Sequence, residues 1–370
     1  MGYRAAIRTA PRAIKIAALA RRAGPFAIAL LLLATPARAD LPHRDMIAAA
    51  NPLATEAGRE ILRRGGSAVD AAIAAQLVLN LVEPESSGIG GGAIMVFWSA
   101  QEHRVTTFDG RETAPTAAKP DRFLDAQGKP LNYFDALVGG RSVGVPGLLR
   151  MLELAHRRYG KLPWASLFAP AIHLAEAGYP MSEKLNGELT RDKLFQKTGA
   201  ARDLFFAADG SVKPVGTILT NPALAATLKV IAKDGAGAFY RGAIASDLVA
   251  AIDHAPLNPG DMTMADIAGY RAKERAPICG TYRVYRLCGM GPPSSGGVAV
   301  LEILGLLQPF DLRHQVNTAE AWNLFAQASR LAEMTQLAFQ VLLADRQILI
   351  HYGVEEFRED VRTFREPERF

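Results

Sequence analysis

Residues 82–115 read VEPESSGIGGGAIMVFWSAQEHRVTTFDGRETAP, and the rest of the chain is organised around this stretch. Residues 93–98 are apolar on both faces of an extended chain, which is typical of a strand in a sheet that is covered on both sides. Residues 99–103 fit a hairpin turn, and residues 104–108 are predicted to form the return strand. Asp109 and Gly110 end this hairpin, so Arg111 is expected just beyond a buried strand, where loop side chains face clefts.

The glycine cluster at residues 88–92 raises the question of a phosphate site. A dinucleotide fold needs the order strand, glycines, helix, whereas here a helical pattern precedes the glycines and a strand follows them. A P-loop is excluded as well, because the chain contains no Gly-Lys-Ser or Gly-Lys-Thr. We interpret the cluster as a tight turn with close backbone packing. The alternative is that free backbone N–H groups in the turn hold an oxyanion.

The first 39 residues have the features of a secretory signal peptide. They hold seven of the 42 basic residues and none of the 37 acidic ones. The apolar run at residues 26–35 and the small-x-small pattern Ala37-Arg38-Ala39 follow, which predicts cleavage before Asp40 and a periplasmic or secreted protein. A membrane span needs ~20 apolar residues, so an uncleaved membrane anchor is the weaker alternative and no stable span is expected after cleavage.

The charge of the chain changes once this leader is set aside. The whole chain has a formal net charge of +5, but residues 40–370 carry −2 because all seven leader charges are positive. A basic surface is the electrostatic requirement for nucleic-acid binding. Nucleic-acid binding is therefore not expected.

Helical patterns surround the decisive stretch. Residues 52–62 are predicted to form a short helix, and Ser67 with Asp70 forms a capping box that begins a second helix leading into the glycine turn. Further helices are expected at residues 146–159, 164–177 and 298–307, and a capping box is expected at Thr263 and Asp266. Residues 119–138 are predicted to be a surface loop. The segment GPPSSGG at residues 291–297 is interpreted as a rigid turn that caps the helix after it.

The two cysteines, Cys279 and Cys288, flank TYRVYRL, which lacks a turn residue and is predicted to be one strand. Nine steps along a strand would separate them by ~30 Å, whereas a disulfide needs Cα atoms within ~7 Å. Both cysteines are therefore predicted to be free. No histidine pair lies near them, so they are not expected to form a zinc site. No metal site and no cofactor are assigned to the chain. A serine–histidine–aspartate triad is not favoured either, because the seven histidines are scattered along the chain.

Several segments taken together resemble the large subunit of gamma-glutamyltranspeptidase (glutathione hydrolase). They occur in the same order between residues 40 and 331, and the ordered set is far more specific than any one of them. The segments are EPESSGIGGGAIMV (83–96), FDGRETAP (108–115), GGRSVGVPG (139–147), YGKLPW (159–164), DMTMADIAGY (261–270), CGTYR (279–283) and GPPSSGG (291–297). Together with the leader, this resemblance predicts a signal peptide at residues 1–39, a large-subunit-like domain at 40–331 and a divergent C-terminal tail at 332–370.

The resemblance implies a fold and a chemistry. The family is an α/β (α+β) N-terminal-nucleophile hydrolase with a four-layer αββα sandwich, of which this chain would supply the incomplete, large-subunit part. The family's small subunit begins with a threonine whose hydroxyl attacks the γ-glutamyl carbonyl, with its own α-amine as base. The resemblance implies that Arg111, the arginine of the FDGRETAP segment, binds the α-carboxylate of the γ-glutamyl group, and a guanidinium fork does match a carboxylate. From the residues alone, the alternative is a salt bridge with Asp109 or Glu112.

The sequence departs from the family in its last part. Thr318, Thr335 and Thr363 lack the Thr-Thr-His context of the family's nucleophile, so no catalytic residue is assigned on this chain. We expect a γ-glutamyl transferase and hydrolase acting on compounds such as glutathione, inactive unless a small catalytic subunit is encoded separately. The alternatives are a non-catalytic remnant or binding protein that retains the carboxylate pocket, and a related amidohydrolase or acylase with another substrate.

Overall fold

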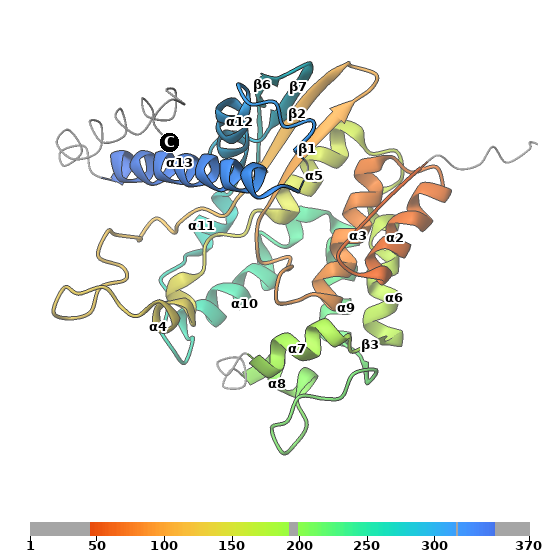
Figure 1. Cartoon of the computed structure of the whole chain (residues 1–370). Helices are drawn as coiled ribbons and strands as arrows, with labels where there is room; N and C mark the ends of the chain where they lie inside the picture. The colour runs from red at the N-terminus through yellow and green to blue at the C-terminus, as the bar shows by residue number, and fades with distance from the viewer. Residues whose placement is uncertain (1–44, 192–198, 316, 345–370) are drawn as a thin grey trace, which may run out of the picture. The chain divides into compact units, whose positions relative to one another are not determined.

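The structure, a computed structural model, describes residues 45–191, 199–315 and 317–344 (Figure 1). The predicted signal peptide and residues 345–370 of the predicted tail lie outside the described residues. The described chain from Ile47 onward belongs to one compact unit. None of the described helices has the length and hydrophobicity of a membrane span.

Helices predominate, and the strands are short. The helices are α2 Pro52–Arg63, α3 Ala68–Val82, α4 Tyr133–Leu137, α5 Leu148–Tyr159, α6 Ala169–Ala177, α7 Glu183–Arg191, α8 Gly199–Phe205, α9 Pro222–Asp234, α10 Gly242–Asp253, α11 Met264–Gly269, α12 Gly296–Leu307 and α13 Ala319–Ala344, with 3₁₀ turns η1 Gly140–Ser142, η2 Trp164–Leu167 and η4 Ala236–Ala238. The strands are β1 Ala93–Ser99, β2 Arg104–Gly110, β3 Tyr179–Pro180, β4 Ile218–Leu219, β5 Lys273–Arg275, β6 Ile278–Tyr282 and β7 Tyr285–Gly289.

Local sequence signals set the ends of the first two described helices. Asn51 caps α2 by accepting a hydrogen bond from the backbone N–H of Leu53, and Pro52 occupies the first turn, where its missing N–H costs nothing. The predicted capping box of α3 is confirmed: Ser67 Oγ accepts from Asp70 N (3.1 Å), and Asp70 Oδ2 accepts from Ser67 N (2.9 Å). The predicted box at Thr263 and Asp266 is also confirmed, at the start of α11.

Asp70 does more than cap its own helix. The residue is fully buried, and its Oδ2 also accepts hydrogen bonds from Lys161 N (2.8 Å) and Leu162 N (3.1 Å). Those two amides lie in the connection that follows α5, about 90 residues further along the chain. A single carboxylate therefore joins the start of α3 to the end of α5.

The largest sheet has the strand order β1-β2-β5 and is antiparallel throughout. The predicted hairpin is confirmed: Ala93 pairs with Gly110, and Ser99 pairs with Arg104 at the turn. Strand β5 pairs with the end of β2, where Thr107 lies opposite Arg275. Strand β2 is thus central and is buried from Thr106 to Gly110, and α5 packs beside the hairpin (Figure 1).

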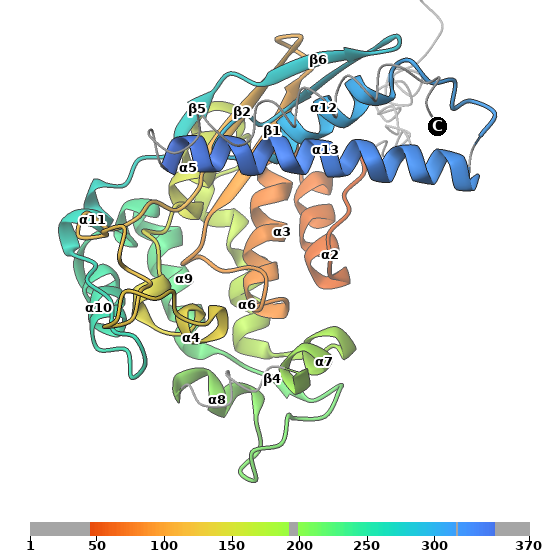
Figure 2. The same ribbon diagram turned by 60° about the vertical axis from the view of Figure 1, so that its left-hand side comes forward.

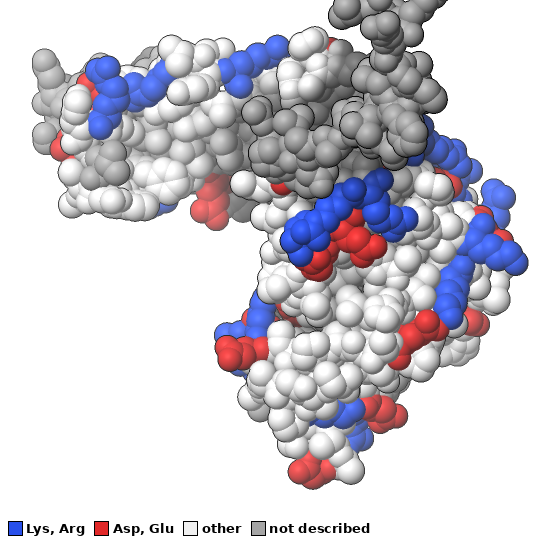
Figure 3. Space-filling view, turned by 90° about the vertical axis from the view of Figure 1, so that its right-hand side faces the viewer, with Lys and Arg blue, Asp and Glu red and all other residues white. Residues whose placement is uncertain are grey.

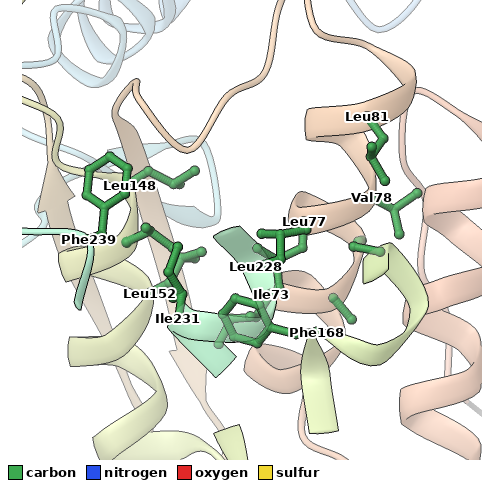
Figure 4. Packing of buried hydrophobic residues seen from close by; sticks show 14 of the residues in the cluster. Ile73, Leu77, Val78, Leu81, Leu148, Leu152, Phe168, Leu228, Ile231 and Phe239 are labelled. Atoms are coloured by element: carbon green, nitrogen blue, oxygen red, sulfur yellow. The ribbon is translucent and has the colours of Figure 1, made fainter. Parts of the chain in front are cut away.

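The hydrophobic core lies between α3, α5, α6 and α9. Figure 4 shows Ile73 and Leu77 of α3 converging with Leu228 and Ile231 of α9 and with Phe168, which precedes α6. All five side chains are almost completely buried. Helix α3 can be surrounded in this way because it is apolar on nearly every side. The core therefore fixes α3, and with it the entry into the glycine turn.

Strand β1 differs from its prediction. Its residues alternate, so that Met95 and Phe97 pack towards the core while Ile94, Val96 and Trp98 are 36%, 49% and 57% exposed. The expectation of a strand covered on both sides is therefore wrong for β1 within the described chain. The apolar sequence indicates that both faces of the strand are suited to burial, but no described element of this chain covers the face of Ile94, Val96 and Trp98.

We expect this open face to limit the solubility of the chain on its own. The triple substitution Ile94→Thr, Val96→Thr and Trp98→Thr should raise the soluble yield and reduce binding of a hydrophobic dye, because it removes an exposed apolar strand face while keeping good strand formers. The control, Met95→Thr with Phe97→Thr on the opposite face, should instead lower the melting temperature. An unchanged soluble yield for the triple variant would contradict the prediction.

The cysteines are a second correction. Cys279 and Cys288 are not free but form a disulfide, because the segment between them folds back as the β6–β7 hairpin. Cys279 lies directly opposite Cys288 in the register, with Cα atoms 4.1 Å apart. The turn is made by Arg283, which adopts a positive φ of 54° although it is not a usual turn residue. The single-strand prediction failed because no turn signal marks this reversal.

Two shorter stretches also differ from prediction. Ser295 precedes α12 but makes no side-chain cap, so the segment at residues 291–297 supplies only the turn, closed by a hydrogen bond from Ser294 N to Gly291 O (3.0 Å). The region 119–138 is mostly loop as expected, yet it contains the short helix α4, which Asn132 caps. The first difference concerns the end of an element, which sequence patterns locate least well, and the second is a short helix within a predicted loop.

The last two described helices pack against each other (Figure 2). Helix α12 also contacts the β6–β7 hairpin. Thr335 Oγ1 on α13 donates a hydrogen bond to Glu302 Oε1 on α12 (2.7 Å). Helix α13 continues without interruption across residues 331 and 332 to Ala344.

Charged side chains on the face shown in Figure 3 lie in mixed groups, with basic residues beside acidic ones. Helix α2 is an example of such pairing, with Arg59 bonded to Glu56 and Arg64 lying 3.5 Å from Glu60. Interspersed charges of both signs do not build a wide positive field. This surface agrees with the small formal charge of residues 40–370.

Candidate functional site

Arg111 lies immediately after β2, as the sequence predicted. Its backbone is held at two points: Arg111 N donates to Asp109 Oδ1 (2.9 Å), and Arg111 O accepts from Tyr270 Oη (2.7 Å). Its side chain is 65% exposed. The residue thus combines a fixed backbone with a guanidinium that is open to solvent.

The alternative interpretation of Arg111 was a salt bridge with Asp109 or Glu112. The Asp109 carboxylate is instead engaged by Arg275, whose Nε donates to Asp109 Oδ2 (2.7 Å). Glu112 Oε2 lies 3.8 Å from Arg111 Nε, which is beyond hydrogen-bond distance. An exposed pair of this kind contributes only about 0–1 kcal/mol. Arg111 therefore keeps donors that an external carboxylate could use.

Glycines bring three segments close together around Arg111. The carbonyl oxygen of Gly91 accepts hydrogen bonds from both Gly147 N and Leu148 N (3.0 Å each), so the glycine turn meets the start of α5. A Cβ on Gly147 would overlap the carbonyl oxygen of Gly110 and the hydroxyl of Tyr270. The interpretation of a tight turn with close backbone packing is confirmed. Gly91 N donates to Gly88 O (3.1 Å), so this amide is not free for an oxyanion.

Two stacked tyrosines hold the backbone segments around Arg111 in place. The rings of Tyr240 and Tyr270 stack with centroids 6.2 Å apart. Tyr240 Oη donates to Pro146 O (3.0 Å), just before the segment that meets Gly91. Burial raises the pKa of Tyr270 to about 12, with Asp109 and Glu112 adding to the shift. Tyr270 therefore stays protonated near neutral pH and keeps its hydrogen bond to Arg111 O.

A buried carboxylate holds the segment that enters the glycine turn. Glu83 is 2% exposed, accepts from Asn51 Nδ2 (3.1 Å) and pairs with Lys184 of α7. Lys184 also lies 3.3 Å from Glu85. Burial raises the pKa of Glu83, but the hydrogen bonds from Lys184 and Asn51 outweigh burial and leave the pKa below its usual value. Glu83 is therefore ionised near neutral pH and anchors the turn.

Several of these supporting residues were not assigned a role from the sequence. Tyr270 and Gly147 belong to segments that were recognised only as matches to the family, and Arg275 carried no signal at all. Spacing could not reveal them because their partners lie far away in sequence, 159 residues in the case of Tyr270 and Arg111. The described residues contain no cluster of three or more histidine, cysteine or acidic residues able to hold a metal ion.

The structure does not bring together the threonines that follow residue 301 into a site. Thr335 Oγ1 donates to Glu302, and Thr318 Oγ1 donates to Gln315 O and accepts from Ala321 N at the start of α13. Thr363 lies outside the described residues. No nucleophile is assigned among the described residues.

Solved structures support the fold assignment. The gamma-glutamyltranspeptidase of Helicobacter pylori superposes with a TM-score of 0.74 at 32% identity, covering 78% of this chain and 82% of that one. The cephalosporin acylase of Bacillus halodurans superposes with a TM-score of 0.66 at 30% identity, covering 77% of this chain and 52% of that one. The fold is therefore that of an N-terminal-nucleophile hydrolase, in its large-subunit part.

Sequence comparison narrows this class to a family. The model of the gamma-glutamyltranspeptidase family matches residues 54–346, a span that begins in α2 and ends beyond α13. The glutathione hydrolase proenzyme of Bacillus subtilis (strain 168) is 37% identical over 294 residues, which are 79% of this chain and 49% of that protein. The chain belongs to the gamma-glutamyltranspeptidase family, and it spans about half the length of the curated relatives it matches.

Proposed function

We propose that this chain is the large-subunit part of an enzyme that transfers γ-glutamyl groups from compounds such as glutathione to water or to amino acids. The observation that carries the proposal is the state of Arg111: its backbone is held by Asp109 and Tyr270, while its guanidinium is 65% exposed. A guanidinium held in this way is suited to bind the α-carboxylate of a γ-glutamyl group through two parallel hydrogen bonds.

The proposal includes a second part that completes the site. The 370 residues contain no Thr-Thr-His sequence, so the attacking threonine is proposed to come from a small catalytic subunit or an equivalent segment. Its hydroxyl would attack the γ-glutamyl carbonyl while its α-amine takes the proton, and water or an amino acid would then release the acyl group. The open face of β1 gives that part an apolar surface to cover.

Export is part of the same proposal. The basic leader, the apolar run at residues 26–35 and the Ala37-Arg38-Ala39 pattern support removal of residues 1–39 and a periplasmic or secreted location. A disulfide between Cys279 and Cys288 is compatible with an oxidising compartment.

A related acylase is the second candidate, favoured by the likeness to a cephalosporin acylase. The two candidates differ in what the substrate must carry. A γ-glutamyl enzyme needs the α-carboxylate that Arg111 would bind, whereas an acylase for another acyl group does not require it. The preference for γ-glutamyl anilide over a simple acyl anilide therefore separates them.

We expect the 370-residue chain alone neither to cleave itself nor to hydrolyse a γ-glutamyl anilide, because no acyl-enzyme can form without the nucleophile. Co-production with the half of the Bacillus subtilis relative that this chain does not match should restore hydrolysis, with each half alone as control. The measurement is release of the aniline. Turnover by the purified single chain that rises with its concentration would contradict the proposal, and equal use of a simple acyl anilide by the pair would favour the acylase.

A further inference from the structure

A pocket of about 250 Å³, whose lining does not include Arg111, lies between α5, the start of α10 and the link from α11 to β5. Its wall is unusually basic, with four arginines and only one acidic residue. The lining residues are Arg150, Glu153, Leu154, Arg157, Arg241, Arg271 and Ala272. Four guanidinium groups and one carboxylate give the wall a formal charge of +3.

The single carboxylate cannot neutralise this wall. Glu153 is shared, with Oε2 lying 3.1 Å from Arg150 Nη1 and Oε1 lying 3.1 Å from Arg157 Nη2. Within the described chain, the Arg271 side chain donates only to backbone carbonyls, those of Ala268 and Tyr270 (2.8 Å each). Both oxygens of the one acidic side chain are therefore in use, and the excess positive charge stays in the pocket.

Two of the arginines are left with unused donors. Arg241 makes no hydrogen bond or ion pair with any residue that the structure describes. The Nε of Arg150 also has no acceptor within the described part of the chain, but it is buried, so the donors that Arg150 can offer to the pocket are those of its terminal nitrogens. The Arg150 head group is nevertheless fixed, because it stacks over the Tyr240 ring at 4.4 Å from the ring centroid. The guanidinium of Arg150 therefore needs little further ordering when an anion binds, and the exposed Arg241 keeps all of its donors for that anion.

We propose that this pocket binds a compact oxyanion that carries two or more negative charges. The guanidinium fork matches phosphate and carboxylate oxygens alike, and an anion here would relieve the repulsion between like charges. A volume of about 250 Å³ is equivalent to roughly eight water molecules at ~30 Å³ each, and it lies below the range of pockets for drug-sized ligands. The size therefore fits an ion such as inorganic pyrophosphate and not a dinucleotide.

An anion in the pocket would contact residues that are linked to the tyrosines supporting the candidate site around Arg111. Arg150 belongs to α5, and the same Tyr240 that it covers holds Pro146 O and stacks on Tyr270. An anion bound to Arg150 would stabilise this group of side chains and so raise the melting temperature of the chain by mass action. The inference does not depend on the proposed catalytic activity.

The test is isothermal titration of the purified chain with inorganic pyrophosphate at low ionic strength. Arg241→Glu should weaken binding by about 10- to 100-fold, because a hydrogen bond to a charged group contributes roughly 1.5–3 kcal/mol and the new carboxylate adds repulsion. Arg157→Glu, at a side chain that is 72% exposed, should weaken it as well. The matched control is Arg63→Glu on α2, which changes the net charge by the same amount at a site outside the pocket and should bind as the wild type does.

Further measurements identify the class of anion and exclude general salt effects. Sodium chloride at matched ionic strength should not raise the melting temperature as pyrophosphate does, and citrate in place of pyrophosphate shows whether carboxylates serve as well as phosphates. Multivalent anions also stabilise proteins without binding a site, but that effect would be equal in wild type and Arg241→Glu. Equal affinity of wild type and Arg241→Glu for both anions, with both variants folded by circular dichroism, would overturn the inference.

Discussion

Arg111→Ala is expected to lower kcat/KM for a γ-glutamyl substrate by about 10²-fold or more in the enzyme completed with its catalytic part. The side chain would donate two charge-assisted hydrogen bonds to the substrate α-carboxylate, each contributing about 1.5–3 kcal/mol, and about 1.4 kcal/mol corresponds to tenfold. Arg111→Lys should recover only part of the loss, since an ammonium group cannot form the planar fork. Steady-state hydrolysis of a γ-glutamyl anilide measures both effects.

The substrate itself provides the strongest control. An anilide without the α-carboxylate should be poor for the wild type and almost indifferent to Arg111→Ala, so that the two changes are coupled. Arg104→Ala, at an exposed arginine that begins the same strand, should leave the kinetics unchanged. Equal losses on both anilides would argue against carboxylate recognition. A lower melting temperature with unchanged kinetics would show that Arg111 serves the fold through Glu112 instead.

Asp70→Ala is expected to lower the free energy of unfolding by about 3 kcal/mol or more, which is the largest effect on stability that we predict. The substitution removes the capping box of α3, worth about 1 kcal/mol, and leaves the amides of Lys161 and Leu162 without their acceptor. Each unsatisfied buried donor costs about 1–3 kcal/mol. Urea unfolding followed by circular dichroism measures the change.

Two variants test the cause of this effect. Asp70→Asn keeps one side-chain oxygen, so it should retain part of the stability that Asp70→Ala loses. Glu60→Ala on the neighbouring helix α2 removes an exposed carboxylate with one distant ion pair and should change stability by less than about 0.5 kcal/mol. If Asp70→Ala and Glu60→Ala destabilised the chain equally, the three hydrogen bonds of Asp70 would not contribute as we infer.

Parts of the fold could be predicted from the sequence wherever the controlling contacts are local. The helix α3 begins at Ser67 and Asp70 because a capping box needs residues only three positions apart. The β1–β2 hairpin follows from two short strands and the turn between them, and its end fixes the position of Arg111. The ordered family segments added what no local pattern contains, namely the expected ligand of Arg111.

The errors arose where the deciding contact was not visible in the local pattern. The reversal between Cys279 and Cys288 depends on Arg283 in a positive-φ conformation, which other tertiary contacts must stabilise. The exposure of Ile94, Val96 and Trp98 depends on whether another layer of structure packs on that face of the sheet. The sequence of an apolar strand is the same in either case, so it cannot predict the exposure.

The sequence by itself therefore determined the family, the large-subunit class of fold, the main local elements and the place of Arg111 at the end of a strand. Only the tertiary structure decided that Arg275 takes the carboxylate of Asp109, that Tyr270 holds the backbone of Arg111, and that arginines of three elements line one basic pocket. The physical reason is the range of the contacts. Capping and turn signals act over a few residues, whereas Arg275 and Asp109 are 166 positions apart, Tyr270 and Arg111 are 159 positions apart, and the pocket arginines come from three separate segments.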